Sequence, residues 1–219
     1  MTPTLVIGNY NYSTWSLRPW LLLAESGIEF NVERIPLDLP DTRQQIMAAS
    51  PAGRVPVLKL GEETIWDSLA IAETIAERWP EKRLWPDDAA DRAQARAVSA
   101  EMHSGFATLR NEMPMNCRAM GRHVKMSEAL ACDIERIRDI FAECADRNDG
   151  NDGGWLFGRF SVADAMFAPV VLRFRTYGVE LPERASRYPE RLLKSEAMQR
   201  WLLAAESETE VIEQEEKGL

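Results

Sequence analysis

The chain has 219 residues, with 26 Lys and Arg against 35 Asp and Glu and a formal net charge of -9. An acidic chain is a poor match for a phosphate backbone, so we expect no nucleic-acid partner. The hydrophobic fraction of 45% and the charged fraction of 28% are typical of a soluble globular protein. No stretch reaches the roughly 20 apolar residues of a transmembrane helix and no secretory signal is evident, so we expect a cytoplasmic protein that does not enter membranes.

The first 80 residues alternate short apolar runs with helical periodicity. In chain order they predict a strand at 4–8, a helix at 15–26, a strand at 30–35, a helix at 41–49, a hairpin with strands at 55–60 and 63–66, and a helix at 67–78. The predicted order is β-α-β-α-β-β-α. A stretch rich in proline and charge then breaks the periodicity.

The rest of the chain has helical periodicity and no convincing strand. Helices are expected at 88–119, 126–146, 162–172 and 189–203, with a polar loop at 146–154. The contrast between the halves predicts two domains, 1–80 and 88–219, joined by a linker at 81–87.

Two further patterns concern the ends of these helices. Ser161 and Asp164 have the spacing of a capping box before a helix that is apolar on nearly every side, which is typical of a helix buried in a bundle. From Glu206 onward, six glutamates against one lysine predict a solvated, frayed tail.

Cysteines and histidines show no metal-binding pattern. Cys117, Cys132 and Cys144 are not spaced as ligand pairs, and His103 and His123 have no partner at ligand spacing. We therefore expect free thiols and no metal.

A first candidate site lies at the start of the first predicted helix. Because Pro19 is tolerated in the first turn of a helix, that helix is expected to begin near Trp15. Ser13 and Thr14 then stand before its N-terminus, where a hydroxyl can donate to an anion that the helix dipole also stabilises. On position alone, Ser13 or Ser16 is more often a simple cap.

Asp67 and Ser68 open the third predicted helix and form a second candidate. Both residues are good caps, but Asp67 can also pair with an ammonium while Ser68 binds a carboxylate, which together suit the end of an α-amino acid. Val55 and Pro56 form a third candidate. Only about 5–6% of X–Pro bonds are cis, so the trans form is expected, whereas a cis bond would expose the Val55 backbone to an extended peptide.

Four segments, at 11–20, 50–58, 66–70 and 158–165, together resemble the glutathione transferase family. The resemblance covers nearly the whole chain. It implies an α/β thioredoxin-like N-terminal domain, an all-helical (all-α) C-terminal domain, a homodimer, and glutathione as co-substrate with a small electrophile.

The resemblance also implies roles for individual residues. Ser13 matches the serine that hydrogen-bonds the glutathione sulfur, with Thr14 beside it. Val55 matches the residue before the family's cis-proline, here Pro56, and its backbone pairs with the cysteinyl unit of glutathione. Asp67 and Ser68 match the pair that holds the γ-glutamyl end. Arg54 is placed near the glycyl carboxylate.

A pocket for the electrophile is expected between the two domains. By the same resemblance, Trp15 points to it from one side, and the helix that carries His103, Phe106 and Arg110 faces it from the other. The helical spacing of these residues is equally that of an interhelical core. His103 or Arg110 would orient a polar or anionic acceptor.

The expected chemistry is activation of a bound thiol. A free thiol titrates near pH ~8.5, and lowering its pKa by about two units corresponds to ~2.7 kcal/mol. One hydrogen bond to a charged group contributes ~1.5–3 kcal/mol, and the helix terminus adds to it. These two free energies together are large enough to lower the pKa of the thiol by two units, as a glutathione transferase requires.

Two alternatives remain open. The zeta class of the family, which isomerises maleylacetoacetate, carries a cysteine where this chain has Trp15. A non-enzymatic dimeric interaction module would use the same fold. Mixed-disulfide chemistry is disfavoured because no cysteine precedes Cys117.

Overall fold

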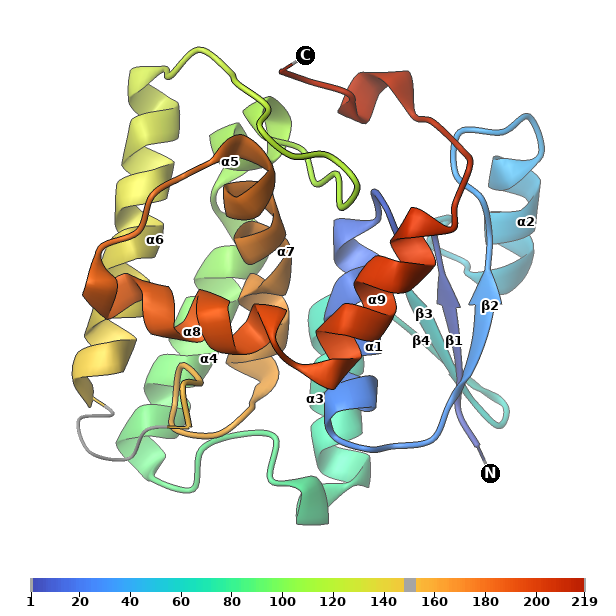
Figure 1. Cartoon of the computed structure of the whole chain (residues 1–219). Coiled ribbons are helices and arrows are strands. Elements are labelled where there is room, and N and C mark those ends of the chain that lie inside the picture. Colours follow the sequence, from blue (N-terminus) through green and yellow to red (C-terminus); the bar gives the residue numbers. More distant parts are fainter. Residues whose placement is uncertain (1, 148–152, 219) are drawn as a thin grey trace.

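Four short strands form a mixed sheet in the order β2-β1-β3-β4 in this computed structural model, which describes residues 2–147 and 153–218 (Figure 1). Strand β1 (Thr4–Ile7) runs parallel to β2 (Asn31–Arg34) and antiparallel to β3 (Val57–Leu60), which pairs antiparallel with β4 (Glu63–Trp66). The connecting helices are α1 (Thr14–Glu25), α2 (Thr42–Ala49) and α3 (Ser68–Arg78). The predicted order of elements is confirmed.

Helices cover both faces of this sheet because its central strand is apolar on both sides. Leu5 and Ile7 belong to the large core that includes α1 and α3, whereas Val6 packs with Ile46 of α2 in a smaller cluster. Successive side chains of a strand point to opposite faces, so a continuous apolar run suits a strand covered twice. Figure 1 shows α2 on the outer face and α1 and α3 between the sheet and the helical part.

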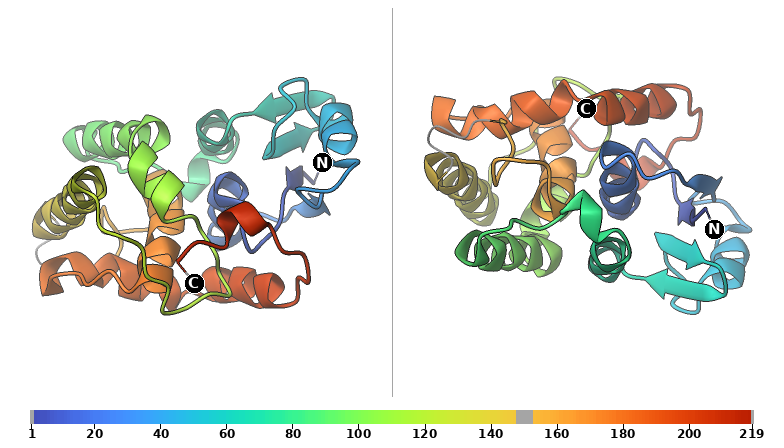
Figure 2. Two further views of the ribbon diagram at one scale, coloured as in Figure 1. Left: turned by 90° about the horizontal axis from the view of Figure 1, so that it is seen from above. Right: turned by 90° about the horizontal axis from the view of Figure 1, so that it is seen from below.

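The helical part is built around α7 (Val162–Tyr177), in which every residue except Arg175 is buried. The surrounding helices are α4 (Ala89–Ser104), α5 (Ala107–Glu112), α6 (Glu128–Arg147), α8 (Glu183–Leu193) and α9 (Glu196–Glu206). Both α4 and α1 pack against α7, which joins the helical part to the sheet part (Figure 2). Within the described ranges, no helix is both long and apolar enough to cross a bilayer. The predicted loop at 146–154 lies partly outside the described residues.

The capping box of α7 is present as predicted. The Asp164 carboxylate accepts the Ser161 N–H (N···O 2.8 Å), the Ser161 hydroxyl (O···O 2.8 Å) and the Leu156 N–H (N···O 2.8 Å). Asp164 is fully buried, and burial raises its pKa to about 7 even though these three hydrogen bonds favour the charged form.

The single helix predicted over 88–119 is wrong, because the chain breaks it at Gly105 and Phe106. Gly105 is extended and Phe106 takes a left-handed conformation with φ 57°. A side chain on Gly105 would come within 2.8 Å of the Glu101 carbonyl oxygen. The Arg110 guanidinium bonds the carbonyls of Met102, His103 and Gly105, and so satisfies the exposed C-terminal end of α4.

The helix predicted over 189–203 is also two helices, α8 and α9. They meet at Ser195, whose hydroxyl accepts the Met198 N–H (N···O 3.3 Å) as the N-cap of α9. Apolar periodicity runs through the junction, so the cap serine is the only local signal for the break.

The solvated tail predicted after Glu206 is wrong as well. Residues 207–218, called here the C-terminal segment, return from α9 to the N-terminal part (Figure 1). Glu208 is buried, and the Glu210 and Glu216 side chains pair with Arg34 and Arg122. A glutamate-rich sequence stays solvated only when it lacks cationic and N–H partners, and both parts of the folded chain supply such partners here.

Candidate active site

One cavity of about 550 Å³ brings most of the predicted site residues together. It is lined by Trp15, Ala52, Arg54, Val55, Pro56, Trp66, Asp67, Ser68 and His103. All of these except Ala52 and Trp66 are predicted from the sequence. The residues come from the start of α1, the turn into β3, the start of α3 and the end of α4, so the cavity lies where the two halves of the chain meet.

The Val55–Pro56 peptide bond is cis, as the family resemblance implies, which corrects the trans form expected from the frequency of X–Pro bonds alone. A frequency averaged over all X–Pro bonds carries no information about the tertiary surroundings of one bond. The bond lies directly before β3 and places both residues in the cavity wall.

Ser13 occupies the N-cap position of α1, but its side chain makes no capping hydrogen bond. Its hydroxyl instead bonds the Ser16 hydroxyl (O···O 2.8 Å), which in turn accepts the Gly8 N–H (N···O 3.0 Å). The helix begins one residue earlier than predicted, so Pro19 lies in its second turn. The capping alternative therefore does not account for the Ser13 hydroxyl.

Cationic side chains gather around Trp15. The Arg18 and Arg110 guanidinium carbons lie 4.2 and 5.3 Å from the indole centroid. Arg18 is buried, and its Nε and Nη1 atoms have no hydrogen-bond partner in the part of the chain that the structure describes. Burial, followed by the charges of Arg173 and Arg110, lowers its pKa to about 9. Arg18 thus keeps its charge at neutral pH. The i, i+3 spacing of residues 15 and 18 is the sequence signal that could have found this group.

Asp67 and His103 connect the two halves across the cavity. One Asp67 carboxylate oxygen accepts the Leu69 N–H (N···O 2.8 Å), as a cap does, and the other lies 3.2 Å from the His103 Nε2 atom. Burial, with the charges of Arg18 and Arg110, lowers the pKa of His103, while Asp67 opposes this shift. The imidazole is therefore mainly neutral at pH 7, and the Asp67 charge is not neutralised by it.

Ser68 supplies a buried hydroxyl that is not satisfied within residues 2–147 and 153–218. Its side chain is almost fully enclosed, and its Oγ atom has no hydrogen-bond partner among these residues although Ser68 lines the cavity. A buried hydroxyl without a partner is destabilising unless a ligand satisfies it. The capping alternative thus holds for Asp67 but not for Ser68.

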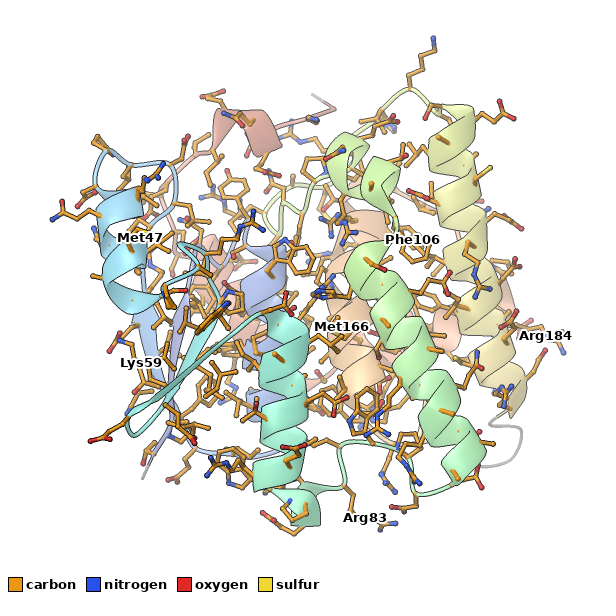
Figure 3. The ribbon with its side chains drawn as sticks, turned by 180° about the vertical axis from the view of Figure 1, so that it is seen from behind. Met47, Lys59, Arg83, Phe106, Met166 and Arg184 are labelled. Atoms are coloured by element: carbon orange, nitrogen blue, oxygen red, sulfur yellow. The ribbon has the colours of Figure 1, made fainter. Side chains whose placement is uncertain are left out.

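Four predicted binding or catalytic residues are not in the wall of this cavity: Ser13, Thr14, Phe106 and Arg110. Ser13 is buried two positions before Trp15, which is in the wall. Phe106 is buried in the core at the bend between α4 and α5, which corrects its assignment to the electrophile pocket (Figure 3). Arg110 lies behind Trp15 and bonds the end of α4, and Thr14 is half-buried at the start of α1. The core alternative is correct for Phe106 because the left-handed turn directs it inward, and periodicity does not reveal such a turn.

The two buried thiols are poorly suited to catalysis. Burial raises the pKa values of Cys117 and Cys144 to about 12, so neither is a thiolate at neutral pH. Across residues 2–147 and 153–218, no group of three His, Cys, Asp or Glu side chains is arranged to hold a metal ion.

Two sequence models of one protein family match most of the chain. The sequence model described as "Glutathione S-transferase, N-terminal domain" matches residues 12–78, and the one for the C-terminal domain matches residues 87–202. The chain belongs to the glutathione S-transferase family. Family membership confirms the predicted fold class and the predicted class of enzyme, a glutathione-dependent transferase.

Relatives and solved structures of the family agree with this. Maleylacetoacetate isomerase from Mus musculus is 35% identical over 84% of this chain and 82% of its own length, and that from Rattus norvegicus is 30% identical over the same shares. A glutathione transferase homologue from Burkholderia, solved with bound glutathione, is similar with a TM-score of 0.70 and 26% identity, covering 95% of this chain and 100% of its own.

Proposed function

We propose that the cavity binds glutathione and that Ser13 assists its thiol to act as a thiolate on a small electrophile. The observation that carries the proposal is the single cavity in which Val55, Asp67 and Ser68 face one another beside the N-terminus of α1. A γ-glutamyl tripeptide needs groups for an ammonium, two carboxylates and a peptide unit, and these are the groups that the wall offers.

The γ-glutamyl end is assigned to the start of α3. Asp67 supplies the charge for the ammonium, while the unpaired Ser68 hydroxyl and the N-terminus of α3 receive the carboxylate. The Val55 backbone pairs with the cysteinyl unit, and Arg54 in the same wall meets the glycyl carboxylate. Thr14 lies beside the sulfur.

The sulfur is assigned to the end of α1. The Ser13 hydroxyl donates to the Ser16 hydroxyl in the structure. A hydroxyl can both donate and accept, so when glutathione binds, the Ser16 hydroxyl turns to donate to Ser13 and the Ser13 proton bonds the thiolate. The thiol loses its proton to solvent, and the thiolate then forms a carbon–sulfur bond as the leaving group departs with the electron pair of the bond it breaks.

The second substrate is assigned to the side of the cavity that Trp15 and His103 form. The charges of Arg18 and Arg110 behind the indole favour an electrophile that carries an anionic group. This observation also supports a second candidate function, isomerisation of the kind named for the mouse and rat relatives. We propose further that the chain acts as a cytoplasmic homodimer, which light scattering of the purified protein tests.

Ultraviolet titration of the complex tests the main proposal. Bound glutathione is expected to absorb as a thiolate with a pKa about two units below the ~8.5 of the free thiol. Turnover is measured in parallel with aryl halides and with an anionic enone. A thiol that ionises as it does in buffer would contradict thiol activation, and absence of glutathione binding at millimolar concentration would favour an interaction module instead.

Asp67→Asn is expected to weaken glutathione binding about 10- to 150-fold, because a hydrogen bond to a charged group contributes ~1.5–3 kcal/mol. The amide oxygen still caps α3, so the fold is retained. Calorimetric titration measures the change, with Asp41→Asn at the exposed start of α2 as the control. Equal affinities of Asp67→Asn and wild type would remove Asp67 from the ammonium site.

A further inference from the structure

The loop of residues 8–13, which carries Ser13, is held by residues nearly 200 positions away in the sequence. The Glu208 carboxylate accepts the Tyr10 N–H at one oxygen (N···O 2.8 Å) and the Asn11 N–H at the other (N···O 2.9 Å). Arg34 of β2 donates to the same carboxylate (N···O 3.1 Å). One side chain of the C-terminal segment therefore bonds two consecutive peptide groups just before Ser13.

Because Glu208 is buried, loss of these hydrogen bonds would cost free energy. The Glu208 side chain is only 4% exposed, and a buried carboxylate is tolerated only when paired and hydrogen-bonded. If the loop moved, the Tyr10 and Asn11 N–H groups would lose their acceptor, and the buried carboxylate would lose both of these donors and keep Arg34. The conformation of the loop and the position of Glu208 therefore stabilise each other.

A second set of hydrogen bonds connects the next residue of the loop, Tyr12, to the C-terminal segment. The Tyr12 hydroxyl donates to the Glu216 carboxylate (O···O 2.7 Å) and accepts from Arg118 (N···O 3.1 Å). Arg118 also bonds the carbonyls of Glu208 and Glu210, which ties both contacts to one guanidinium. Each of the three residues before Ser13 is thus bonded to the C-terminal segment.

We propose that Glu208 is a positioning residue for the thiol chemistry, holding the backbone of Tyr10 and Asn11 so that the Ser13 hydroxyl meets the glutathione sulfur. The C-terminal segment then completes the active site without touching the substrate. The physical reason is the short range of hydrogen bonds, since a donor displaced by less than 1 Å no longer bonds its acceptor effectively. This inference rests on the proposed function of Ser13.

Glu208→Gln tests the proposal against Glu210→Gln. The glutamine amide turns one acceptor into a donor that faces a backbone N–H, which displaces the loop. Glu210 pairs with the same Arg34 (N···O 2.8 Å), and none of its described contacts reaches the loop, so it is the matched control.

The expected signature is a split between chemistry and binding. Glu208→Gln should raise the pKa of the bound thiol by about one unit and lower kcat at about pH 6.5 roughly tenfold, with kcat recovering above about pH 9. The KM for glutathione should change less than about threefold, because Val55, Asp67 and Ser68 are untouched. Glu210→Gln should match wild type in every measurement. A Glu208→Gln enzyme with the wild-type pH profile would overturn the proposal.

Two further measurements keep the outcome decisive. Tyr12→Phe removes only a hydroxyl and should shift the profile in the same direction by a smaller amount, so it serves if Glu208→Gln does not fold. Hydrogen exchange of the Tyr10 and Asn11 amides, without glutathione, should be slow in wild type and at least tenfold faster in Glu208→Gln. If wild type does not activate glutathione, the proposed function fails on its own. If the Tyr10 and Asn11 amides exchange at the wild-type rate in Glu208→Gln, the claim that Glu208 stabilises the loop is refuted.

Discussion

Ser13→Ala is expected to lower turnover at about pH 6.5 by about 10- to 150-fold, while glutathione affinity changes less than about threefold. The range corresponds to the ~1.5–3 kcal/mol of a hydrogen bond to a charged acceptor, which the thiolate has and the thiol lacks. The Ser13 hydroxyl makes no capping bond, so its removal should leave α1 intact. Rates across a pH series, with glutathione saturating, measure the effect.

The pH series also separates this role from a structural one. Loss of thiolate stabilisation should return the apparent pKa of the bound thiol toward ~8.5, so the variant approaches wild-type turnover at high pH. Ser104→Ala, which removes an exposed hydroxyl at the end of α4, serves as the control. Conjugation at about pH 6.5 that survives Ser13→Ala intact would show that another group stabilises the thiolate.

Asp164→Ala is expected to lower the free energy of unfolding by about 3–6 kcal/mol. The variant removes the carboxylate that accepts the Ser161 and Leu156 N–H groups, and each such bond to a carboxylate contributes ~1.5–3 kcal/mol. For a chain of this size, the melting temperature should fall by roughly 10 °C or more. Urea and thermal unfolding followed by circular dichroism measure both. Asp88→Ala, which loses two similar bonds at the exposed start of α4, should cost much less.

Asp164 also makes a pH prediction. Burial raises its pKa to about 7 from an ordinary value of 3.8, so the folded chain binds this proton more tightly than the unfolded chain does. The contribution of Asp164 to stability is therefore fully present below about pH 4 and declines as the pH rises to about 7. Asp164→Asn lacks this titration, so the stability of wild type relative to Asp164→Asn should be higher at about pH 5 than at about pH 8. A difference that is constant, or that grows with pH, would contradict the raised pKa.

The N-terminal part was predictable because its signals are local. An apolar run such as that of β1 and a hairpin turn at Gly61 are patterns of neighbouring residues, and the strands and helices they predict are present. Asp67 and Ser68 are adjacent in sequence at a helix N-terminus, so their meeting in one wall needs no tertiary information.

The bend between α4 and α5 and the ordered C-terminal segment were not predictable from local patterns. The bend at Phe106 depends on Arg110 bonding the end of α4, and the ordered C-terminal segment depends on N–H groups at Tyr10 and Asn11. The contact of His103 with Asp67 joins the ends of two helices that neither local pattern relates.

Local patterns were enough to predict the order of elements, the buried helix with its capping box, and the residue types at the site, since each follows from periodicity or from one turn of chain. The cationic surroundings of Trp15 and the hydrogen bonds of Glu208 to the Ser13 loop could not be read from local patterns. These depend on which charges and peptide groups lose water together, and burial of that kind is set by the packing of distant segments.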